Sequence, residues 1–146
     1  MRILQIDRSE LEPQVSGSRR PWLTAAYGRL LELPGHPQSR VMIAVEEGQP
    51  RAVLGLELEW AVDGRLVRAV IRLLEVDPEH DRRGIGSRLV RFAEGIAHIN
   101  GCERVDVATG LERWGGGGCW LSLGYDDDLG PGLSKDITPR FLHGYA

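Results

Sequence analysis

Apolar residues recur at alternate positions, or in short unbroken runs, through the middle of the chain, between residues 41 and 76. The run Val41–Val45 predicts a short strand followed by a turn at 47–50. The segments Val53–Trp60 and Leu66–Val76 predict a hairpin, because the Asp63-Gly64 pair between them favours a type I′ turn.

The predicted hairpin can be aligned residue by residue from a two-residue loop at Asp63-Gly64. This alignment brings three apolar pairs together on one face: Trp60 with Val67, Leu58 with Ala69, and Leu56 with Ile71. The other face carries charged side chains from both strands: Glu57, Glu59, Arg68 and Arg72. A shift by one residue would mix the two faces, so the pattern favours this register.

Two regions have apolar residues three or four positions apart, which predicts helices. Residues 84–100 form the clearest helix, with one apolar stripe and charged residues opposite it. Residues 8–33 predict two shorter helices interrupted at Pro13 and Gly17, with Pro21 as the first residue of the second helix.

The segment Arg104–Ala108 predicts another short strand, and residues 124–137 predict one or two more. A strand, a helix and a strand within about 40 residues are typical of a crossover between two parallel strands. The predicted fold is therefore α/β, of the α+β kind. It has a mixed, largely antiparallel central sheet, one parallel crossover pair and flanking helices.

Composition narrows the class of protein. The 146 residues carry a net charge of −3, which suits one globular domain spanning 1–146. No basic cluster favours a nucleic-acid partner, and no apolar run reaches the roughly 18 residues that span a bilayer. The N-terminus carries no signal-peptide pattern, so we expect a cytoplasmic protein without a membrane partner. The four histidines lack metal-ligand spacing, so no metal is expected.

Glycine is unusually frequent, at 19 residues, and two glycines stand where chemistry is expected. The stretch from Leu74 to Ser87 ends a strand, passes through a short Pro-Glu loop and opens the clearest helix at Gly84 and Gly86. The free N–H groups of a helix start attract anions, and glycines let a phosphate approach the backbone. This stretch therefore predicts a phosphate or pyrophosphate cradle, with Arg82 and Arg83 adding positive charge.

Other phosphate-binding motifs fit less well. A P-loop requires a lysine directly after its last glycine, and Lys135 is the only lysine of the chain. A dinucleotide-binding fingerprint requires a third glycine where Leu89 stands, and an early parallel unit.

The stretch 81–87 resembles motif A of the GNAT family of N-acetyltransferases, whose pattern is Gln/Arg-x-x-Gly-x-Gly/Ala. The residues before it, Leu74 to Glu79, resemble that family's strand end and Pro-Glu loop. Leu123-Gly124-Tyr125 is similar to the family's later Leu-Gly-Phe. The order of elements matches from about residue 38 to 128.

The resemblance implies an acyl-CoA N-acyltransferase fold, with acetyl-CoA or another acyl-CoA as donor and a primary amine of a small molecule or protein as acceptor. Acetyl transfer would be direct, without a covalent enzyme intermediate, and a homodimer is one option for the assembly. The implied coenzyme A-binding residues come from the strand end, motif A and a later segment: Leu74, Glu75, Val76, Asp81, Arg82, Arg83, Gly84, Ile85, Gly86, Ser87 and Arg113.

Three residues depart from the family pattern. Asp81 stands where the family has Gln or Arg, and Arg113 where it often has Asn. Trp120 replaces the tyrosine that protonates the leaving thiolate in many members, and an indole is no acid at neutral pH. Tyr125 and Tyr145 are the substitutes to consider. The four glycines at 115–118 also disfavour the helix that the family usually has there.

The proton acceptor is open as well, because the attacking amine must be neutral. Glu57 and Glu59 are the first candidates for the catalytic base, and Glu75 is the third. The plainer interpretation of Glu57 and Glu59 is cross-strand ion pairing with Arg68 and Arg72.

Three functions therefore stay open. The first is an active acetyl-CoA-dependent N-acetyltransferase. The second is a catalytically impaired GNAT-fold module that binds acyl-CoA or regulates a partner. The third is a phosphate-binding α/β domain outside this family.

Overall fold

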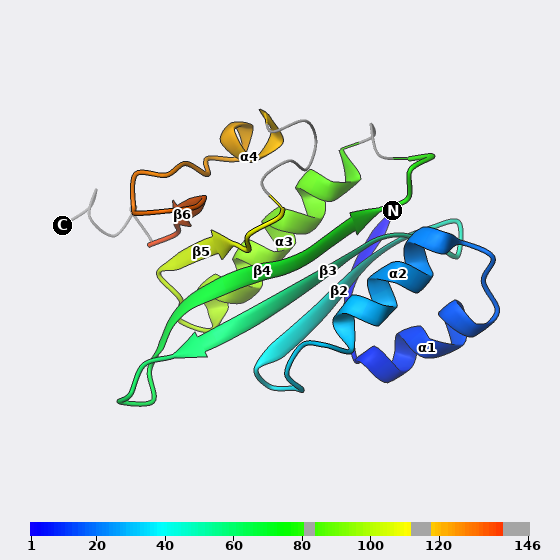
Figure 1. Ribbon diagram of the computed structural model, residues 1–146, viewed down its shortest axis with the longest axis horizontal. Coiled ribbons are helices and arrows are strands. Elements are labelled where there is room, and N and C mark those ends of the chain that lie inside the picture. Colours follow the sequence, from blue (N-terminus) through cyan, green and yellow to red (C-terminus); the bar gives the residue numbers. More distant parts are fainter. Residues whose placement is uncertain (81–83, 112–117, 139–146) are drawn as a thin grey trace.

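The computed structural model describes residues 1–80, 84–111 and 118–138 (Figure 1). Its helices and strands follow in this order along the chain: β1 (Arg2–Ile6), α1 (Arg8–Ser16), α2 (Pro21–Leu30), β2 (Ser39–Glu46), β3 (Gln49–Trp60), β4 (Leu66–Val76), α3 (Ile85–Ile99), β5 (Arg104–Val107), α4 (Gly118–Ser122) and β6 (Ser134–Asp136).

The six strands form one sheet in the order β1-β2-β3-β4-β5-β6. Every neighbouring pair is antiparallel except β4 and β5, which run parallel because α3 carries the chain back between them. This confirms the predicted mixed sheet with one parallel crossover. The edge strand β1 was not predicted.

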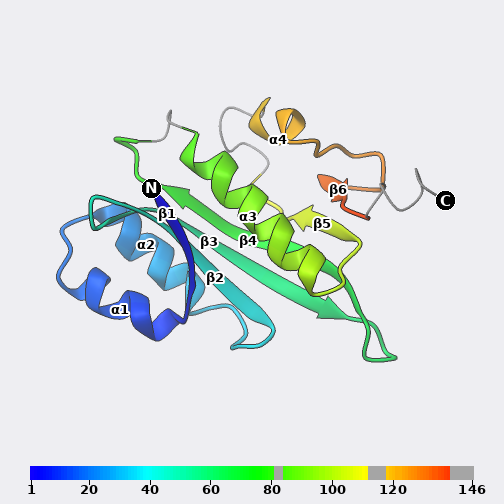
Figure 2. The ribbon, with the colours of Figure 1, turned by 180° about the vertical axis from the view of Figure 1, so that it is seen from behind.

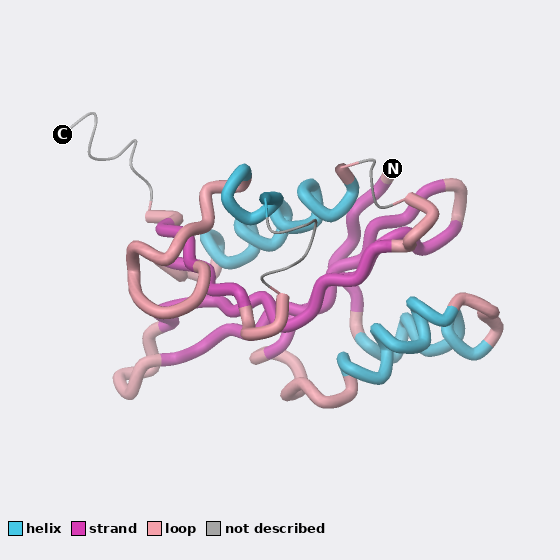
Figure 3. The backbone as a smooth tube through the Cα atoms, turned by 45° about the horizontal axis from the view of Figure 1, so that its top comes forward, coloured by secondary structure: helices cyan, strands magenta, loops and turns pink. Residues whose placement is uncertain are grey.

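Helices cover both faces of the sheet (Figure 3). On one face, α1 and α2 bury Leu11, Leu23 and Leu30 against inward-facing residues of β2, β3 and β4. On the other face, α3 packs against the sheet (Figure 2). Trp120 and Tyr125 complete this larger core. Burial of these apolar side chains on both faces is the main favourable term for the fold.

The β3–β4 turn differs from the predicted one. Gly64 has a positive φ of 84° but Asp63 does not, so the pair is no type I′ turn. The Ala61 N–H donates to the Arg65 carbonyl at 2.7 Å, which makes the loop one residue longer than predicted. Trp60 therefore lies opposite Leu66 rather than Val67, and a bulge restores the predicted register beyond it.

Beyond that bulge, the predicted pairs of Leu58 with Ala69 and of Leu56 with Ile71 are confirmed. Two consecutive positive φ values occur instead in the β2–β3 turn, at Glu47 (54°) and Gly48 (73°). The type I′ geometry that closes a two-residue hairpin loop therefore belongs to that turn.

The helix predictions are confirmed in outline, with two corrections. Pro21 opens α2 as predicted, but Pro13 lies inside α1, which continues to Ser16. Gly118 is the first residue of α4, so one of the four glycines is helical, while 115–117 lie outside the described residues. Trp60, which the predicted alignment places on the apolar face of the hairpin, is 43% exposed near the hairpin tip rather than in the core.

Within the described parts of the chain, no helix combines the length and the apolar character needed to cross a lipid bilayer.

The close approach of α2 to the sheet predicts opposite effects for two glycine substitutions. A Cβ at Gly55 of β3 would lie 3.0 Å from Leu33 Cδ1 and 3.1 Å from Leu30 Cδ2, whereas a Cβ at Gly95 of α3 would meet nothing within 4 Å. We expect Gly55→Ala to lower the free energy of unfolding by about 1–2 kcal/mol. Gly95→Ala should raise it by about 0.5–1 kcal/mol, because alanine favours helix. Chemical denaturation measures both, and equal effects of the two substitutions would contradict this packing.

Candidate functional site

The strands β4 and β5 stay together for only part of their length. They pair from Arg68 with Arg104 to Ile71 with Val107, and the Ala108 N–H then donates to the Ile71 carbonyl at 2.9 Å. Past this point β4 continues to Val76, whereas β5 has ended. In the described part of the chain, no strand pairs with the outer edge of β4 beyond Ile71.

This open edge presents backbone hydrogen-bonding groups. The Asp77 N–H donates to the Arg51 carbonyl of β3 at 2.7 Å, and the register pairs Glu75 with Val53. In an antiparallel pair, successive residues of a strand point their N–H and C=O groups alternately towards the partner strand and away from it. Since Glu75 and Asp77 point towards β3, Leu74 and Val76 turn theirs away from β3. These groups point to the open edge, where an extended chain could add as another strand.

The open edge of β4 leads towards the start of α3. Gly84 precedes that helix with a left-handed φ of 74°. The first hydrogen bond within the helix is donated by the Arg88 N–H to the Gly84 carbonyl, at 3.2 Å. The N–H groups of Ile85, Gly86 and Ser87 therefore have no earlier turn of helix to bond with, which favours an anion at this end.

The predicted cradle residues Asp81, Arg82, Arg83 and Arg113 lie outside the described residues. The structure therefore places the glycine half of the predicted cradle at the N-terminus of α3. It does not test the arginine half.

A buried aspartate fixes the loop between β4 and α3. Asp77 is 5% exposed, its carboxylate lies 3.5 Å from the Arg51 guanidinium, and it accepts from the Glu79 N–H at 3.1 Å. His80 Nδ1 lies 3.3 Å from the same carboxylate. Asp77, Glu79 and His80 bring oxygen and nitrogen atoms within 4.8 Å of one another. The Arg51 cation already balances Asp77, so this cluster holds the loop in place.

Charged residues meet on the sheet face opposite α3, beside the point where β4 and β5 separate. Ala69, Ile71 and Val105 pack on the α3 side, so alternate residues such as Arg68 and Asp106 lie on the other side. Arg68 donates to Glu59 at 2.5 Å and also to Asp106.

The same network continues along the strands on either side. Arg72 donates to Glu57 at 2.7 Å and lies 3.7 Å from Glu59. Arg104 donates two hydrogen bonds to the Asp106 carboxylate, at 2.9 and 2.8 Å. The cross-strand ion pairs expected for Glu57 and Glu59 are therefore present. The two members of this network on β5, Arg104 and Asp106, were not predicted from the sequence, although they alternate with two valines as in a half-buried strand.

Asp106 is the most firmly held acid of this network. Burial by itself would raise the pKa of Asp106, but hydrogen bonds from Arg104, Ser134 and Arg68 outweigh it and hold the pKa below its usual value. The pKa of Arg68 is raised, chiefly by its hydrogen bond to Glu59. Asp106 and Arg68 therefore both carry their charge near neutral pH.

A pocket of about 320 Å³ opens over this network. Arg72 reaches it from β4, and the pocket includes the residues that follow β5, from Val107 to Thr109. The loop 131–134 closes its other side. The pocket thus lies against the separation point of β4 and β5, on the face opposite α3.

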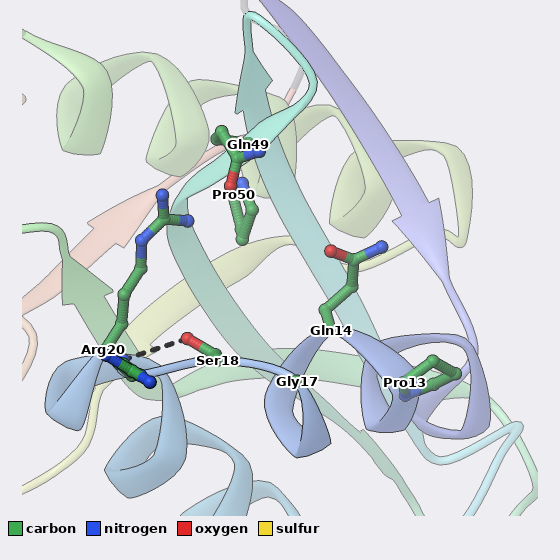
Figure 4. Close-up of a pocket in the computed structure, with 8 residues that line it drawn as sticks. Pro13, Gln14, Gly17, Ser18, Arg20, Gln49 and Pro50 are labelled. Carbon is green, nitrogen blue, oxygen red and sulfur yellow. Dashed lines mark hydrogen bonds between the residues drawn. The ribbon is translucent and has the colours of Figure 1, made fainter.

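A second pocket, of about 390 Å³, lies between the α1–α2 connection and the β2–β3 turn (Figure 4). Gln14 and Arg20 extend from the helical side towards Gln49 and Pro50. The Arg20 N–H donates to Ser18 Oγ at 2.9 Å. None of the described cradle residues lines this pocket, so it is separate from the cradle.

The aromatic residues considered as proton donors are buried. Trp120 is 0% exposed, and its indole N–H donates to the Leu111 carbonyl at 2.6 Å. Tyr125 is also 0% exposed, stacks edge-to-face on Trp120 and donates its hydroxyl to Glu94 at 2.7 Å. Burial and the Glu94 charge raise the pKa of Tyr125 well above its usual value. Tyr125 thus belongs to the core, and Tyr145 lies outside the described residues.

Glu75, the remaining candidate base, lies on the side of β4 that faces α2. Its carboxylate accepts from Arg29 of α2 at 2.8 Å. Glu57, Glu59 and Glu75 are therefore all ion-paired to arginines.

The comparisons with known proteins agree with this geometry. The family model described as Acetyltransferase (GNAT) family matches residues 2–113. The chain belongs to this family. A search of curated proteins finds no match.

Solved structures share the fold across nearly the whole chain. An aminoglycoside 6'-acetyltransferase type Ii matches with a TM-score of 0.68 and 20% identity, over 96% of this chain and 99% of the other. An aminoglycoside 6'-N-acetyltransferase from Enterococcus faecium matches with a TM-score of 0.69 and 18% identity, over the same shares. An aminoglycoside 6'-N-acetyltransferase complexed with coenzyme A matches with a TM-score of 0.67 and 16% identity, over 96% and 99%. This likeness confirms the acyl-CoA N-acyltransferase fold.

The burial of Tyr125 predicts a purely structural role for its hydroxyl. Tyr125→Phe should lower the free energy of unfolding by about 1–2 kcal/mol, because Glu94 loses one donor but keeps Lys135 at 3.1 Å. It should leave coenzyme A affinity unchanged. Denaturation and calorimetry measure the two effects. The matched control is Tyr27→Phe in α2, which should change neither. A loss of coenzyme A affinity at unchanged stability would contradict this assignment.

Proposed function

We propose that the chain is a single-domain, acetyl-CoA-dependent N-acetyltransferase that moves the acetyl group directly to a primary amine. The observation that carries this proposal is the continuous path from the α3 N-terminus, along the open edge of β4, to the separation of β4 and β5. Family membership supports acetyl-CoA as the donor, and the structural relative complexed with coenzyme A supports its binding to this fold.

Each part of the donor would have its own partners along this path. The pyrophosphate would bind the N–H groups of Ile85, Gly86 and Ser87, with Arg82, Arg83 and Arg113 adding positive charge. Asp81 would take part in this cradle only through its backbone, with its carboxylate turned away from the pyrophosphate. The pantetheine arm would pair with the outward groups of Leu74 and Val76, like an added strand, beside Glu75. The thioester would then reach the separation point near Ile71, next to the charged pocket.

The transfer itself needs few protein groups. The amine nitrogen forms a bond to the acetyl carbon, the C–S bond breaks, and coenzyme A leaves as a thiolate. A base must take the proton that the amine gives up. Glu57 and Glu59 remain the proposed acceptors because they lie on β3 next to the pocket-lining strand. Each is engaged by arginine hydrogen bonds, so a water molecule would relay the proton.

A second function has one specific observation in its favour. Trp120 and Tyr125 are both buried and hydrogen-bonded, so neither supplies the tyrosine acid typical of many family members. A module that binds acyl-CoA without turnover, acting through a partner, would need no such acid.

The cradle predicts a selective loss of binding in Gly84→Glu. A carboxylate beside the pyrophosphate would repel it, and like-charge contacts of this kind cost several kcal/mol. We expect acetyl-CoA affinity, measured by calorimetry, to fall by about 100-fold or more.

The matched control for this substitution is Gly64→Glu. Gly64 also has a left-handed φ, 84° against 74° for Gly84, and a Cβ meets nothing within 4 Å at either position. Both variants therefore bear the same backbone strain, but only one places a charge at the cradle. Equal affinities of the two variants for acetyl-CoA would overturn the cradle.

Turnover separates the enzyme from the binding module. With saturating acetyl-CoA, we expect steady release of the coenzyme A thiol with at least one member of a panel of primary amines. Glu57→Gln or Glu59→Gln should then lower kcat by about 100-fold or more, if that carboxylate accepts the proton.

The control for these variants is Glu12→Gln, an exposed acid on α1, which should leave turnover unchanged. Tight acetyl-CoA binding without thiol release from any amine would favour the binding module. Unchanged kcat in both glutamate variants would remove Glu57 and Glu59 as bases.

A further inference from the structure

The charged pocket beside the separation point contains arginines from two strands. Arg68, Arg72 and Arg104 all line it, and Asp106 is the only acid among its described lining residues. Because the acyl end of the donor would stop at this point, the pocket is where an acceptor would approach. This step depends on the function proposed above.

The accessible charge of the pocket is positive, although the ion-pair network as a whole is balanced. The guanidinium side chains of Arg68, Arg72 and Arg104 are 36–37% exposed. Their partners are more deeply placed: the side chains of Asp106, Glu57 and Glu59 are 11%, 13% and 28% exposed.

Asp106 has little capacity left for a cationic ligand. Its two oxygens accept two hydrogen bonds from Arg104, one from Arg68 and one from Ser134. Each guanidinium has five N–H groups, and the described residues accept only part of them. The free hydrogen-bonding capacity of the pocket is therefore that of cationic donors.

We propose that the acceptor is a small amine that also carries an oxyanionic group, a carboxylate or a phosphate, which binds Arg72 and Arg104 in this pocket. Planar guanidinium groups suit such oxyanions, since they bind them through paired hydrogen bonds. Polycationic amines, the aminoglycosides named for the structural relatives, meet the wrong charge here.

Matched acceptors test the charge preference. Thiol release is measured with amino acids and their carboxamides, such as β-alanine and β-alaninamide, with 2-aminoethyl phosphate, and with kanamycin. We expect kcat/KM for an anionic member to exceed that of its carboxamide by about tenfold or more. The ratio of kcat/KM for β-alanine to kcat/KM for 2-aminoethyl phosphate identifies which oxyanion is preferred.

Arginine variants locate the effect. Arg72→Gln should bring the ratio of anionic to neutral acceptor close to one, while acetyl-CoA affinity stays unchanged. The control is Arg65→Gln, the same charge change at a 73% exposed arginine in the hairpin loop, which should keep the ratio. Preference for kanamycin or the carboxamides, or a ratio that survives both Arg72→Gln and Arg104→Gln, overturns the proposal.

A binding measurement separates this proposal from the function on which it rests. Arginine Nε–H signals are followed by NMR while β-alanine or 2-aminoethyl phosphate is added to the protein with coenzyme A present. Shifts of the Arg72 and Arg104 signals support the oxyanion site even if no amine is acetylated. Failure to bind acetyl-CoA would refute the transferase. Absence of any shift with both probes would refute the oxyanion site.

Discussion

The parting of β4 and β5 after Ile71 is the constraint on which the candidate site depends. A parallel pair requires a crossover, and α3 supplies it on one face of the sheet. Past Ile71 the two strands separate, so the last residues of β4 keep outward-facing backbone groups without a strand partner in the described chain. The same crossover points the N-terminus of α3 towards that end of β4. An open edge and an anion-attracting helix end thus come from one topological event.

A bulge in β4 sharpens this arrangement. Gly55 lies opposite Leu73 and Leu56 opposite Ile71, so Arg72 is the extra residue with no partner across the ladder. The bulge lets Leu73 join the core beneath α2 while Arg72 lines the pocket beside it. The arginine therefore reaches the separation point without a charge being buried under the helices. Its pairing with Glu57 fixes the side chain at little energetic cost, because both groups stay partly hydrated.

Periodicity was sufficient to predict the order of the main elements and the Leu58–Ala69 pairing, because burial on one face dictates alternation. It failed near Asp63-Gly64, where a dipeptide preference gave way to a longer loop compensated by a bulge. Gly84 was predicted to open the clearest helix, and it does precede α3, with a left-handed φ that glycine adopts readily. The Asp106 part of the charged pocket was not predicted, since it arises from residues on β4 and β5 that only the parallel register brings together.

The burial of Trp120 and Tyr125 excludes these two side chains as acids in the proposed reaction, but releasing the thiolate without their help costs little free energy. A thiol ionises near pH 8.5, so releasing coenzyme A as a thiolate near pH 7 costs only about 2 kcal/mol more than releasing the thiol. That is a small part of the roughly 8–23 kcal/mol by which enzymes lower barriers. The amine proton is the harder problem, because a protonated amine cannot attack at all. In the proposed reaction, holding a neutral amine next to the thioester therefore matters more than protonating the leaving group, and binding an oxyanion at Arg72 would serve that positioning.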